Sequence, residues 1–271
     1  MLGTCMTARL CACRHTGDNA DDGLSSVRNL PSGISEVYYM NSISSLISGL
    51  ERPSAGSEET ARRVLELCGK ISPKNAVFIG DDSFTPALIQ EQTKADVLAC
   101  FAEQNRAERA KKAGLTAKIS MPFEIPARDN GKWDFIWYNG VTSFDGSTRL
   151  PELIYEALEK GGTAVYRTLC WLIDPSPDTK CYVERRFGRP EPLDAVLRNA
   201  KEQGFGIRDF YIAPKTDWTH GLYEPLRSAM QALEGASEDG AETGISELNK
   251  EMDMFELHSE EYSFVYYILE K

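Results

Sequence analysis

Strand-sized apolar runs alternate with amphipathic, charged stretches along most of this chain, and this alternation limits the fold more than any other feature. Many of the runs are rich in β-branched or aromatic residues, and helix-like stretches with helix-starting or helix-ending residues separate them. The runs predict strands at 75–80, 96–101, 117–121, 133–138, 163–169, 207–212 and 262–269. Strands that alternate with helices at this spacing indicate an α/β fold with a mostly parallel sheet, covered by helices on both faces.

The predicted helices have recognisable boundaries. Ser57 can cap a helix that continues to Leu67, and Thr85 followed by Pro86 is typical of a helix start, with Thr85 at the cap. Gly114 closes a charged helix that begins near Glu103. Further helices are predicted at 43–50, 150–159 and 192–203.

The composition of the chain changes near residue 40. Residues 1–39 are rich in Gly, Asp, Asn, Ser and Arg without a sustained period, which predicts a disordered or loosely attached arm. Residues 40–271 predict one domain, with helical lid elements near 40–56 and 215–258.

Charge and cysteine content exclude several classes of function. The net charge of -11 argues against nucleic acid and anionic membranes as partners, and no apolar run is long enough for a transmembrane helix. An odd number of cysteines, 7, with several in predicted buried elements, argues against a disulfide framework and favours a reducing cytoplasm. Cys11, Cys13 and His15 lack a second ligand pair, so no metal site is predicted.

Open parallel sheets bind ligands at the carboxyl ends of their strands, near the point where the strand order reverses. The first predicted strand ends at Gly80, so we expect a ligand site around Gly80-Asp81-Asp82-Ser83-Phe84.

Several segments in sequence order are similar to one family. They are Glu51-Arg52-Pro53 with Gly56-Ser57-Glu58-Glu59-Thr60, Trp133-Asp134-Phe135-Ile136-Trp137, Leu158-Glu159-Lys160-Gly161-Gly162, Tyr223-Glu224-Pro225-Leu226, and the closing run Tyr262 to Tyr267. In order and spacing they resemble class I S-adenosylmethionine (SAM) dependent methyltransferases of the bacterial small-molecule branch. The resemblance implies a Rossmann-like, seven-stranded sheet of order 3-2-1-4-5-7-6 with an antiparallel last strand. It also implies methyl transfer from SAM to a small molecule.

The cofactor positions implied by the resemblance are altered. The family carries an acid two positions before a glycine-rich loop, but here Phe78 stands at the acid and only Gly80 matches a glycine. Asp82 and Phe84 replace the next two glycines, and Phe84 is expected to fill space that the cofactor needs. Asp81 and Asp82 precede a helix N-terminus, whose N–H groups a carboxylate can occupy in place of a ligand.

Other edges of the same site are altered as well. Phe101 stands where the second strand should end in an acid that binds the ribose hydroxyls, and Glu103 is the nearest substitute. After the third strand, the stretch from Ser120 has no acid before Glu124. By the resemblance, the cofactor-binding candidates are Gly80, Asp81, Asp82, Glu103 and Tyr138.

Acceptor-side candidates follow the fourth strand and lie in the predicted lid. Tyr138, Asn139 and His220 are candidate catalytic groups, and Arg52, Trp218 and Tyr223 are candidate substrate-pocket residues. The alternatives are that Tyr138 and Trp218 only pack and that His220 is solvated.

Two functions follow from these observations. One is an active SAM-dependent methyltransferase with an atypical loop. The other is a pseudoenzyme that binds a ligand or a protein partner, as a homodimer or a heterodimer. A dehydrogenase needs a G-x-G-x-x-G loop after the first strand, and the loop at Gly80 lacks it.

Overall fold

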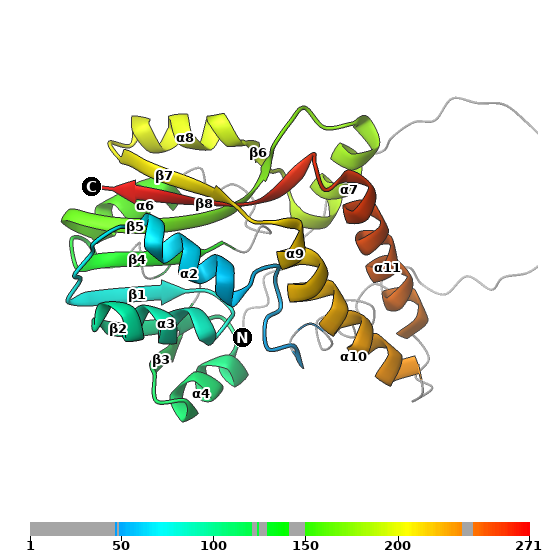
Figure 1. The fold of residues 1–271 in the computed structure, drawn as a ribbon, viewed down its shortest axis with the longest axis horizontal. Coiled ribbons are helices and arrows are strands. Elements are labelled where there is room, and N and C mark those ends of the chain that lie inside the picture. Colours follow the sequence, from blue (N-terminus) through cyan, green and yellow to red (C-terminus); the bar gives the residue numbers. More distant parts are fainter. Residues whose placement is uncertain (1–46, 48, 121–123, 125–128, 141–149, 235–240) are drawn as a thin grey trace, which may run out of the picture.

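The computed structural model describes residues 47, 49–120, 124, 129–140, 150–234 and 241–271 (Figure 1). These residues form one mixed sheet of order β3-β2-β1-β4-β5-β8-β7, which confirms the predicted order, with β8 and β7 as the expected seventh and sixth strands. The strands are β1 (Asn75–Ile79), β2 (Asp96–Phe101), β3 (Thr116–Ile119), β4 (Trp133–Asn139), β5 (Leu158–Trp171), β6 (Glu191–Pro192), β7 (Gly206–Ile212) and β8 (Tyr262–Glu270). β6 lies off this path and pairs with β5, and β8 is antiparallel to both β5 and β7.

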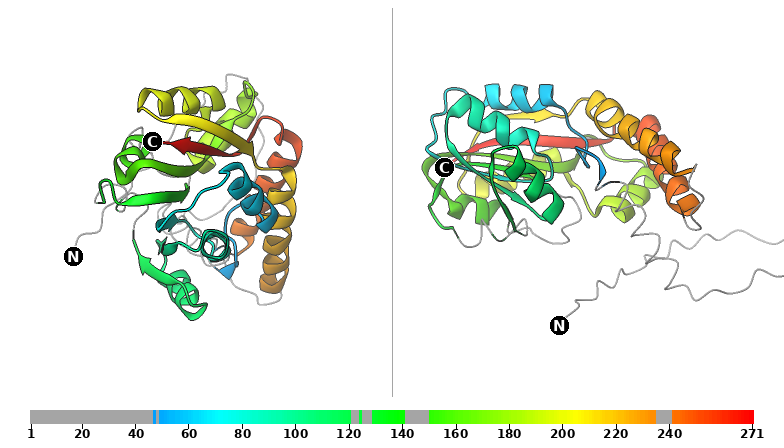
Figure 2. Two further views of the ribbon diagram at one scale, coloured as in Figure 1. Left: turned by 60° about the vertical axis from the view of Figure 1, so that its left-hand side comes forward. Right: turned by 90° about the horizontal axis from the view of Figure 1, so that it is seen from below.

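Helices cover both faces of the sheet, and a further group stands beyond its carboxyl-end edge (Figures 1 and 2). One face carries α2 (Glu58–Leu67), α3 (Phe84–Thr93) and α4 (Gln104–Lys112), and the other carries α6 (Leu150–Ala157) and α8 (Leu193–Glu202). The lid group consists of α7 (Pro177–Phe187), α9 (Lys215–Trp218), the π-helical turn η1 (Thr219–Tyr223), α10 (Glu224–Glu234) and α11 (Ala241–His258). Its helices lie at the end toward which the parallel strands point.

Successive side chains along each strand point to opposite faces of the sheet, so the strands contribute to two hydrophobic cores. On β1, Ala76 and Phe78 pack into the core beneath α2 and α3, whereas Val77 and Ile79 pack into the core beneath α6 and α8. All four are almost completely buried, which is why the strand reads as a continuous apolar run.

The register of the central strands places their carboxyl ends side by side. Ile79 at the end of β1 pairs with Cys100 on β2 and with Tyr138 on β4. The chain that follows each strand therefore reaches the same edge of the sheet, beneath the lid helices.

Some element boundaries differ from the sequence prediction. α3 begins at Phe84, so Thr85 lies inside its first turn rather than at the cap. α6 ends at Ala157 because Leu158 already pairs with Trp133 of β4. The predicted arm 1–39 and most of the predicted helix 43–50 lie outside the described residues.

Helix α7 was not predicted, although its signals are present in the sequence. Ser176 caps the helix by accepting a hydrogen bond from the Thr179 N–H, and Pro177 occupies the first turn.

Asp134 joins the starts of two central strands. Its carboxylate Oδ2 accepts hydrogen bonds from the Lys74 N–H (2.7 Å) and the Asn75 N–H (2.8 Å). Burial acts to raise its pKa, but the backbone donors outweigh burial, and the net pKa is lowered.

Replacing Asp134 with Asn should lower the free energy of unfolding by about 1–3 kcal/mol at pH 7, because a charged acceptor of two N–H groups is lost. Because the pKa of Asp134 is lower in the folded protein than in the unfolded chain, its carboxylate stabilises the fold at pH values above the unfolded pKa of about 4. This stabilisation is lost as the pH falls through the folded-state pKa. Urea unfolding of both proteins at several pH values measures this. A difference between them that grows toward acid pH would contradict the assignment.

Candidate functional site

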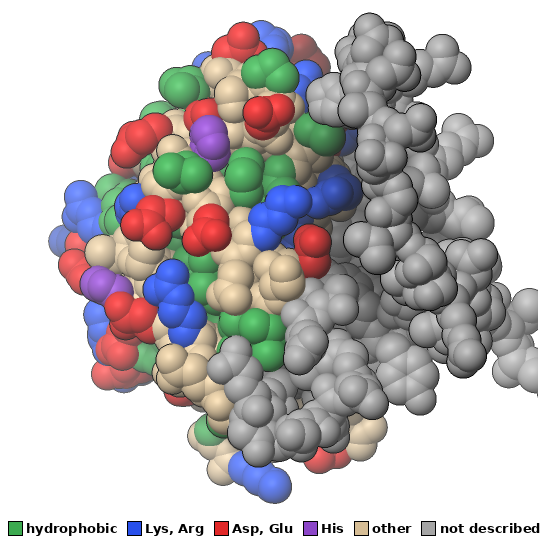
Figure 3. Space-filling model, turned by 90° about the vertical axis from the view of Figure 1, so that its right-hand side faces the viewer, with side chains coloured by type: hydrophobic (Ala, Val, Ile, Leu, Met, Phe, Trp, Pro, Cys, Tyr) green, Lys and Arg blue, Asp and Glu red, His purple; other side chains and the backbone are tan. Residues whose placement is uncertain are grey.

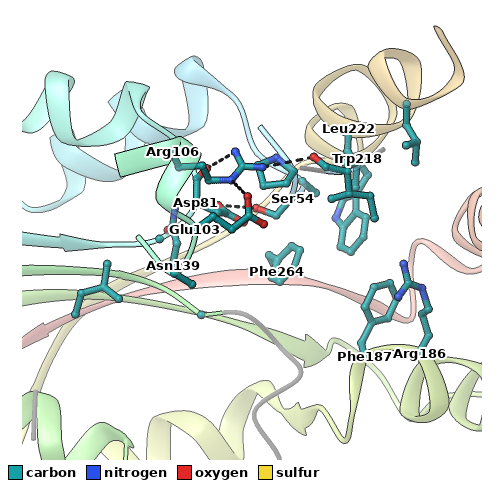
Figure 4. Close-up of a pocket in the computed structure, with 18 of the residues that line it drawn as sticks. Ser54, Asp81, Glu103, Arg106, Asn139, Arg186, Phe187, Trp218, Leu222 and Phe264 are labelled. Atoms are coloured by element: carbon teal, nitrogen blue, oxygen red, sulfur yellow. Dashed lines mark hydrogen bonds and ion pairs between the residues drawn. The ribbon is translucent and has the colours of Figure 1, made fainter. Parts of the chain in front are cut away.

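A cavity of about 370 Å³ opens at the carboxyl ends of β1, β2 and β4 and continues beneath the lid (Figure 4). Its strand-side wall includes Ile79, Gly80, Asp81, Cys100, Ala102, Glu103, Arg106, Ser120, Asn139, Gly140 and Phe264, and its lid-side wall includes Arg186, Phe187, Trp218, Leu222, Leu226, Leu248 and Glu251. Ile47 and residues 53–55 contribute from the segment before α2. The position matches the ligand site expected at the end of the first strand.

The loop after β1 is held by the buried carboxylate of Asp82. Asp82 Oδ1 accepts from the Thr85 N–H of α3 at 2.7 Å, and Oδ2 accepts from Asn139 Nδ2 at 3.2 Å. Asn139 Oδ1 in turn accepts from Trp137 Nε1 at 2.7 Å. A side chain of the loop therefore occupies one N–H donor at the start of α3, as the sequence predicted. Asp82 does not line the cavity.

Asp81 faces the cavity and lies near two arginines. Its Oδ1 accepts from Ser54 Oγ at 3.3 Å, and Ser54 Oγ accepts from Arg167 Nη1 at 3.2 Å. Loss of hydration raises the pKa of Asp81, the cations of Arg167 and Arg106 act to lower it, and the neighbouring Asp82 acts to raise it. The net direction is upward, so this carboxyl group takes up a proton more readily than an exposed aspartate.

Arg167 is a buried cation on β5. Its Nη2 donates to the Ala55 carbonyl at 2.6 Å, and its guanidinium carbon lies 3.6 Å from the ring centroid of Phe264. This cation–π contact and the bonds to residues 54 and 55 fix the segment before α2 against the sheet.

The two positions at which the resemblance implies cofactor-binding acids hold aromatic rings in the core. Phe78 and Phe101 are fully buried, and their ring centroids lie 6.1 Å apart. A Cβ on Gly80 would come within 2.5 Å of Phe78 Cζ, so the ring fills the space beneath the loop and requires glycine there. Neither ring lines the cavity.

The sequence analysis placed Phe84 in the cofactor space, and this was wrong. Its half-buried ring lies between the guanidinium groups of Arg52 and Arg62, each 5.9 Å from the ring centroid. Phe84, the first residue of α3, contacts Arg62 of α2 and does not line the cavity. Arg52, predicted as a substrate-pocket residue, packs on this ring and does not line the cavity either.

Beyond β2, Glu103 and Arg106 form one wall of the cavity. Arg106 Nε donates to Glu103 Oε2 at 3.1 Å, and Arg106 Nη1 donates to the Asp81 carbonyl at 2.8 Å. The Arg106 side chain is nearly buried, whereas the Glu103 side chain is 48% exposed. Figure 4 shows both groups close to Asp81 and Ser54. Arg106 thus holds the loop after β1 through the Asp81 carbonyl.

The structure separates the remaining candidates. Asn139 and Trp218 line the cavity. Tyr138 is buried against Tyr166 in the core beneath α6 and α8, and burial raises its pKa. The His220 side chain is 66% exposed, with Nε2 3.5 Å from Glu224 Oε1, and Tyr223 is buried without lining the cavity. These positions do not support the roles predicted for Tyr138, His220 and Tyr223.

Sequence reasoning missed Arg106, Arg186 and Glu251. Arg186 Nε donates to Glu251 Oε2 at 2.6 Å, which joins the end of α7 to α11 across the lid side of the cavity. Recognising α7 from its Ser176-Pro177 start would have placed Arg186 in the lid, but no local signal pairs it with a carboxylate 65 residues away.

Neither metal nor membrane chemistry is indicated for the described residues. Within those ranges, no group of three or more His, Cys, Asp or Glu side chains is arranged to hold a metal ion. No helix in the same part of the chain combines the length and the apolarity needed to cross a bilayer. The earlier candidates Cys11, Cys13 and His15 lie outside it.

Comparison with solved structures identifies the fold. The sequence itself matches no family model and no curated protein. The structure is similar to E. coli YjhP (TM-score 0.70, 13% identity, 84% of this chain and 98% of that chain). It is equally similar to a SAM-dependent methyltransferase from Geobacter sulfurreducens in complex with S-adenosyl-L-homocysteine (TM-score 0.69, 14% identity, 84% and 96%).

A phosphoethanolamine N-methyltransferase 2 from Haemonchus contortus, in complex with SAM, also matches (TM-score 0.61, 16% identity). The match covers 87% of this chain and 56% of that longer one. At these identities the comparisons establish the fold: this chain has the Rossmann-like fold of SAM-dependent methyltransferases.

Replacing Asp82 with Ala should lower the free energy of unfolding by about 1–2 kcal/mol, because the first turn of α3 loses a capping acceptor. Ser83 is the matched control, since its side chain makes no capping hydrogen bond and Ser83→Ala should be nearly neutral. Chemical denaturation measures both. Equal destabilisation by the two changes would show that the Asp82 carboxylate does not hold the loop.

Proposed function

We propose that this chain is a SAM-methyltransferase-like protein in which SAM binding is weakened or lost, and which acts through its cleft as a non-catalytic ligand-binding protein. The observation that carries this proposal is the buried Phe78–Phe101 pair, because it stands where the resemblance implies two cofactor-binding acids. The fold and a cavity of about 370 Å³ are kept, which supports a retained ligand site.

The residues present do not fit the cofactor in the manner that the resemblance implies. Neither aromatic ring can accept a hydrogen bond from an ammonium group or from ribose hydroxyls. The N–H of Thr85 is already bonded to Asp82, whose carboxylate would also repel the carboxylate of SAM. Each missing buried polar contact is worth about 1–3 kcal/mol, and together they correspond to several powers of ten in affinity.

Isothermal titration with SAM and S-adenosylhomocysteine tests the proposal. We expect no saturable binding at micromolar concentrations, with circular dichroism confirming that the protein is folded. A dissociation constant in the micromolar range for the unmodified chain would contradict it.

One observation favours the alternative of an active SAM-dependent methyltransferase. Glu103 follows β2, lines the cavity and is half exposed, so its carboxylate could take the place of the acid missing at Phe101. Asp81 adds a second acid to the same wall. In this alternative, Asp81 and Glu103, which follow the positions of the missing acids in the sequence, would bind the cofactor. Asn139 would lie next to it.

Glu103→Gln distinguishes the alternatives. If Glu103 binds ribose hydroxyls, the variant should bind SAM about tenfold more weakly than the unmodified chain, since charge-assisted hydrogen bonds would become neutral ones. Glu108→Gln is the control, because Glu108 lies on the exposed side of α4, the helix that begins directly after Glu103, and is bonded to Gln104. Under the primary proposal, neither variant nor the unmodified chain binds SAM measurably.

A further inference from the structure

The lid side of the cavity is lined mainly by apolar side chains. Apart from Arg186 and Glu251, the described lid residues that line it are all apolar: Phe187, Trp218, Leu222, Leu226 and Leu248. Phe264 of β8 lies between this wall and the strand side (Figure 4). Such a wall offers packing surface to an aromatic or aliphatic molecule.

The protein itself holds this wall in place. The ring of Trp218 stacks on Phe255 (4.6 Å between ring centroids) and on Phe264 (5.0 Å). Its Nε1 donates to Ser263 Oγ at 3.2 Å, and Ser263 Oγ donates to the Ala213 carbonyl. An indole has no other polar group, so Trp218 presents only apolar surface to the cavity.

The charged side chains on the lid side neutralise each other. Arg186 Nε donates to Glu251 Oε2 at 2.6 Å, and only 4% of the Glu251 side chain is exposed. A charged group of a ligand at this wall would therefore meet a cation and an anion together, rather than a single charge that it could pair with.

The charges on the strand side are compensated in the same way. Arg106 Nε donates to Glu103 Oε2 at 3.1 Å. Asp81 accepts from Ser54 Oγ, and Ser54 Oγ accepts from the buried guanidinium of Arg167, so a cation lies directly behind this acid. These residues and the Arg186–Glu251 pair include every charged side chain among the described residues that line the cavity.

This arrangement favours an uncharged ligand over a charged one. A charged group that enters the cavity loses hydration, and the paired side chains do not replace that hydration with a free counter-ion. An uncharged apolar molecule gains from burial against the lid wall instead. The cavity volume of about 370 Å³ is sufficient for a small molecule.

We propose that the lid side of the cleft binds an uncharged aromatic or aliphatic small molecule, whose body packs against Phe187, Trp218 and Leu222. This inference names the ligand class of the cleft and rests on the proposed function only in that the cleft is a ligand site.

Three naphthalene compounds that differ in one substituent test the inference in the absence of SAM. At pH 7, 2-naphthylmethanol is neutral, naphthalene-2-carboxylate is an anion and 2-naphthylmethylammonium is a cation. Isothermal titration of the full chain with each compound measures their affinities. We expect saturable binding of the neutral compound, about tenfold or more tighter than that of either charged compound.

Variants of the lid wall place the binding in the cavity. Phe187 is half-buried at the end of α7 and lines the cavity, so Phe187→Ala should weaken binding of 2-naphthylmethanol about tenfold. Leu222→Ala, at a second position of the wall, should weaken it as well. Leu257→Ala is the control, because Leu257 is an apolar lid residue on α11 that is 77% exposed and does not line the cavity. Thermal unfolding confirms that each variant is folded.

The inference is overturned if no compound binds saturably, or if either charged compound binds as tightly as the neutral one. Unchanged affinity in both folded wall variants, or equal weakening by Leu257→Ala, would show that the neutral compound binds elsewhere on the surface and would also overturn it. Tight SAM binding would contradict the proposed function without changing these results, so the two failures can be told apart.

Discussion

The geometry of the cleft depends on the hydrogen bonds that the Asp82 carboxylate accepts. It accepts from the Thr85 N–H at the start of α3 and from Asn139 at the end of β4, and Asn139 accepts from the buried indole of Trp137. Three bonds in series thus connect the loop after β1 to the neighbouring strand. A buried network of this kind is rigid when every member is paired, which is the case here.

Further contacts of the protein's own side chains support the loop after β1. Phe78 and Phe101 fill the core below the loop, and Arg106 donates a hydrogen bond to the loop carbonyl of Asp81. The loop is supported by the protein's own side chains, so its shape does not require a bound ligand. The cavity above it is lined by Asp81, Glu103 and Arg106 toward the strands and by the Arg186–Glu251 pair toward the lid.

The lid adds a further level of organisation. Arg186 on α7 pairs with Glu251 on α11, and the Gly56 N–H donates to the Asp217 carbonyl of α9 at 3.2 Å. The segment before α2 is therefore tied both to the lid and, through Arg167, to β5. Seen from the lid side, acidic and basic side chains are interspersed among apolar ones over the described surface (Figure 3).

Sequence patterns were enough for the strands and the α/β class, because each buried strand is an apolar run and each crossover helix has its own boundary signals, whereas the sheet order came from the family resemblance. They also predicted that an acid of the loop would occupy a helix N–H, because that interaction is local. The direction of the Phe84 side chain was not predictable, since it depends on packing against Arg52 and Arg62. The Arg186–Glu251 pair could not be predicted from the sequence either, because only the folded lid brings α7 and α11 together.

We propose that the cleft is open to ligands but does not hold SAM in the manner that the family resemblance implies. A crystal structure of the unmodified protein grown with millimolar S-adenosylhomocysteine is the decisive measurement. We expect no ordered nucleoside in the cleft, with Phe78 and Phe101 in contact and Asp82 bonded to Thr85 and Asn139. A bound nucleoside with its ribose hydroxyls on Glu103 would contradict it.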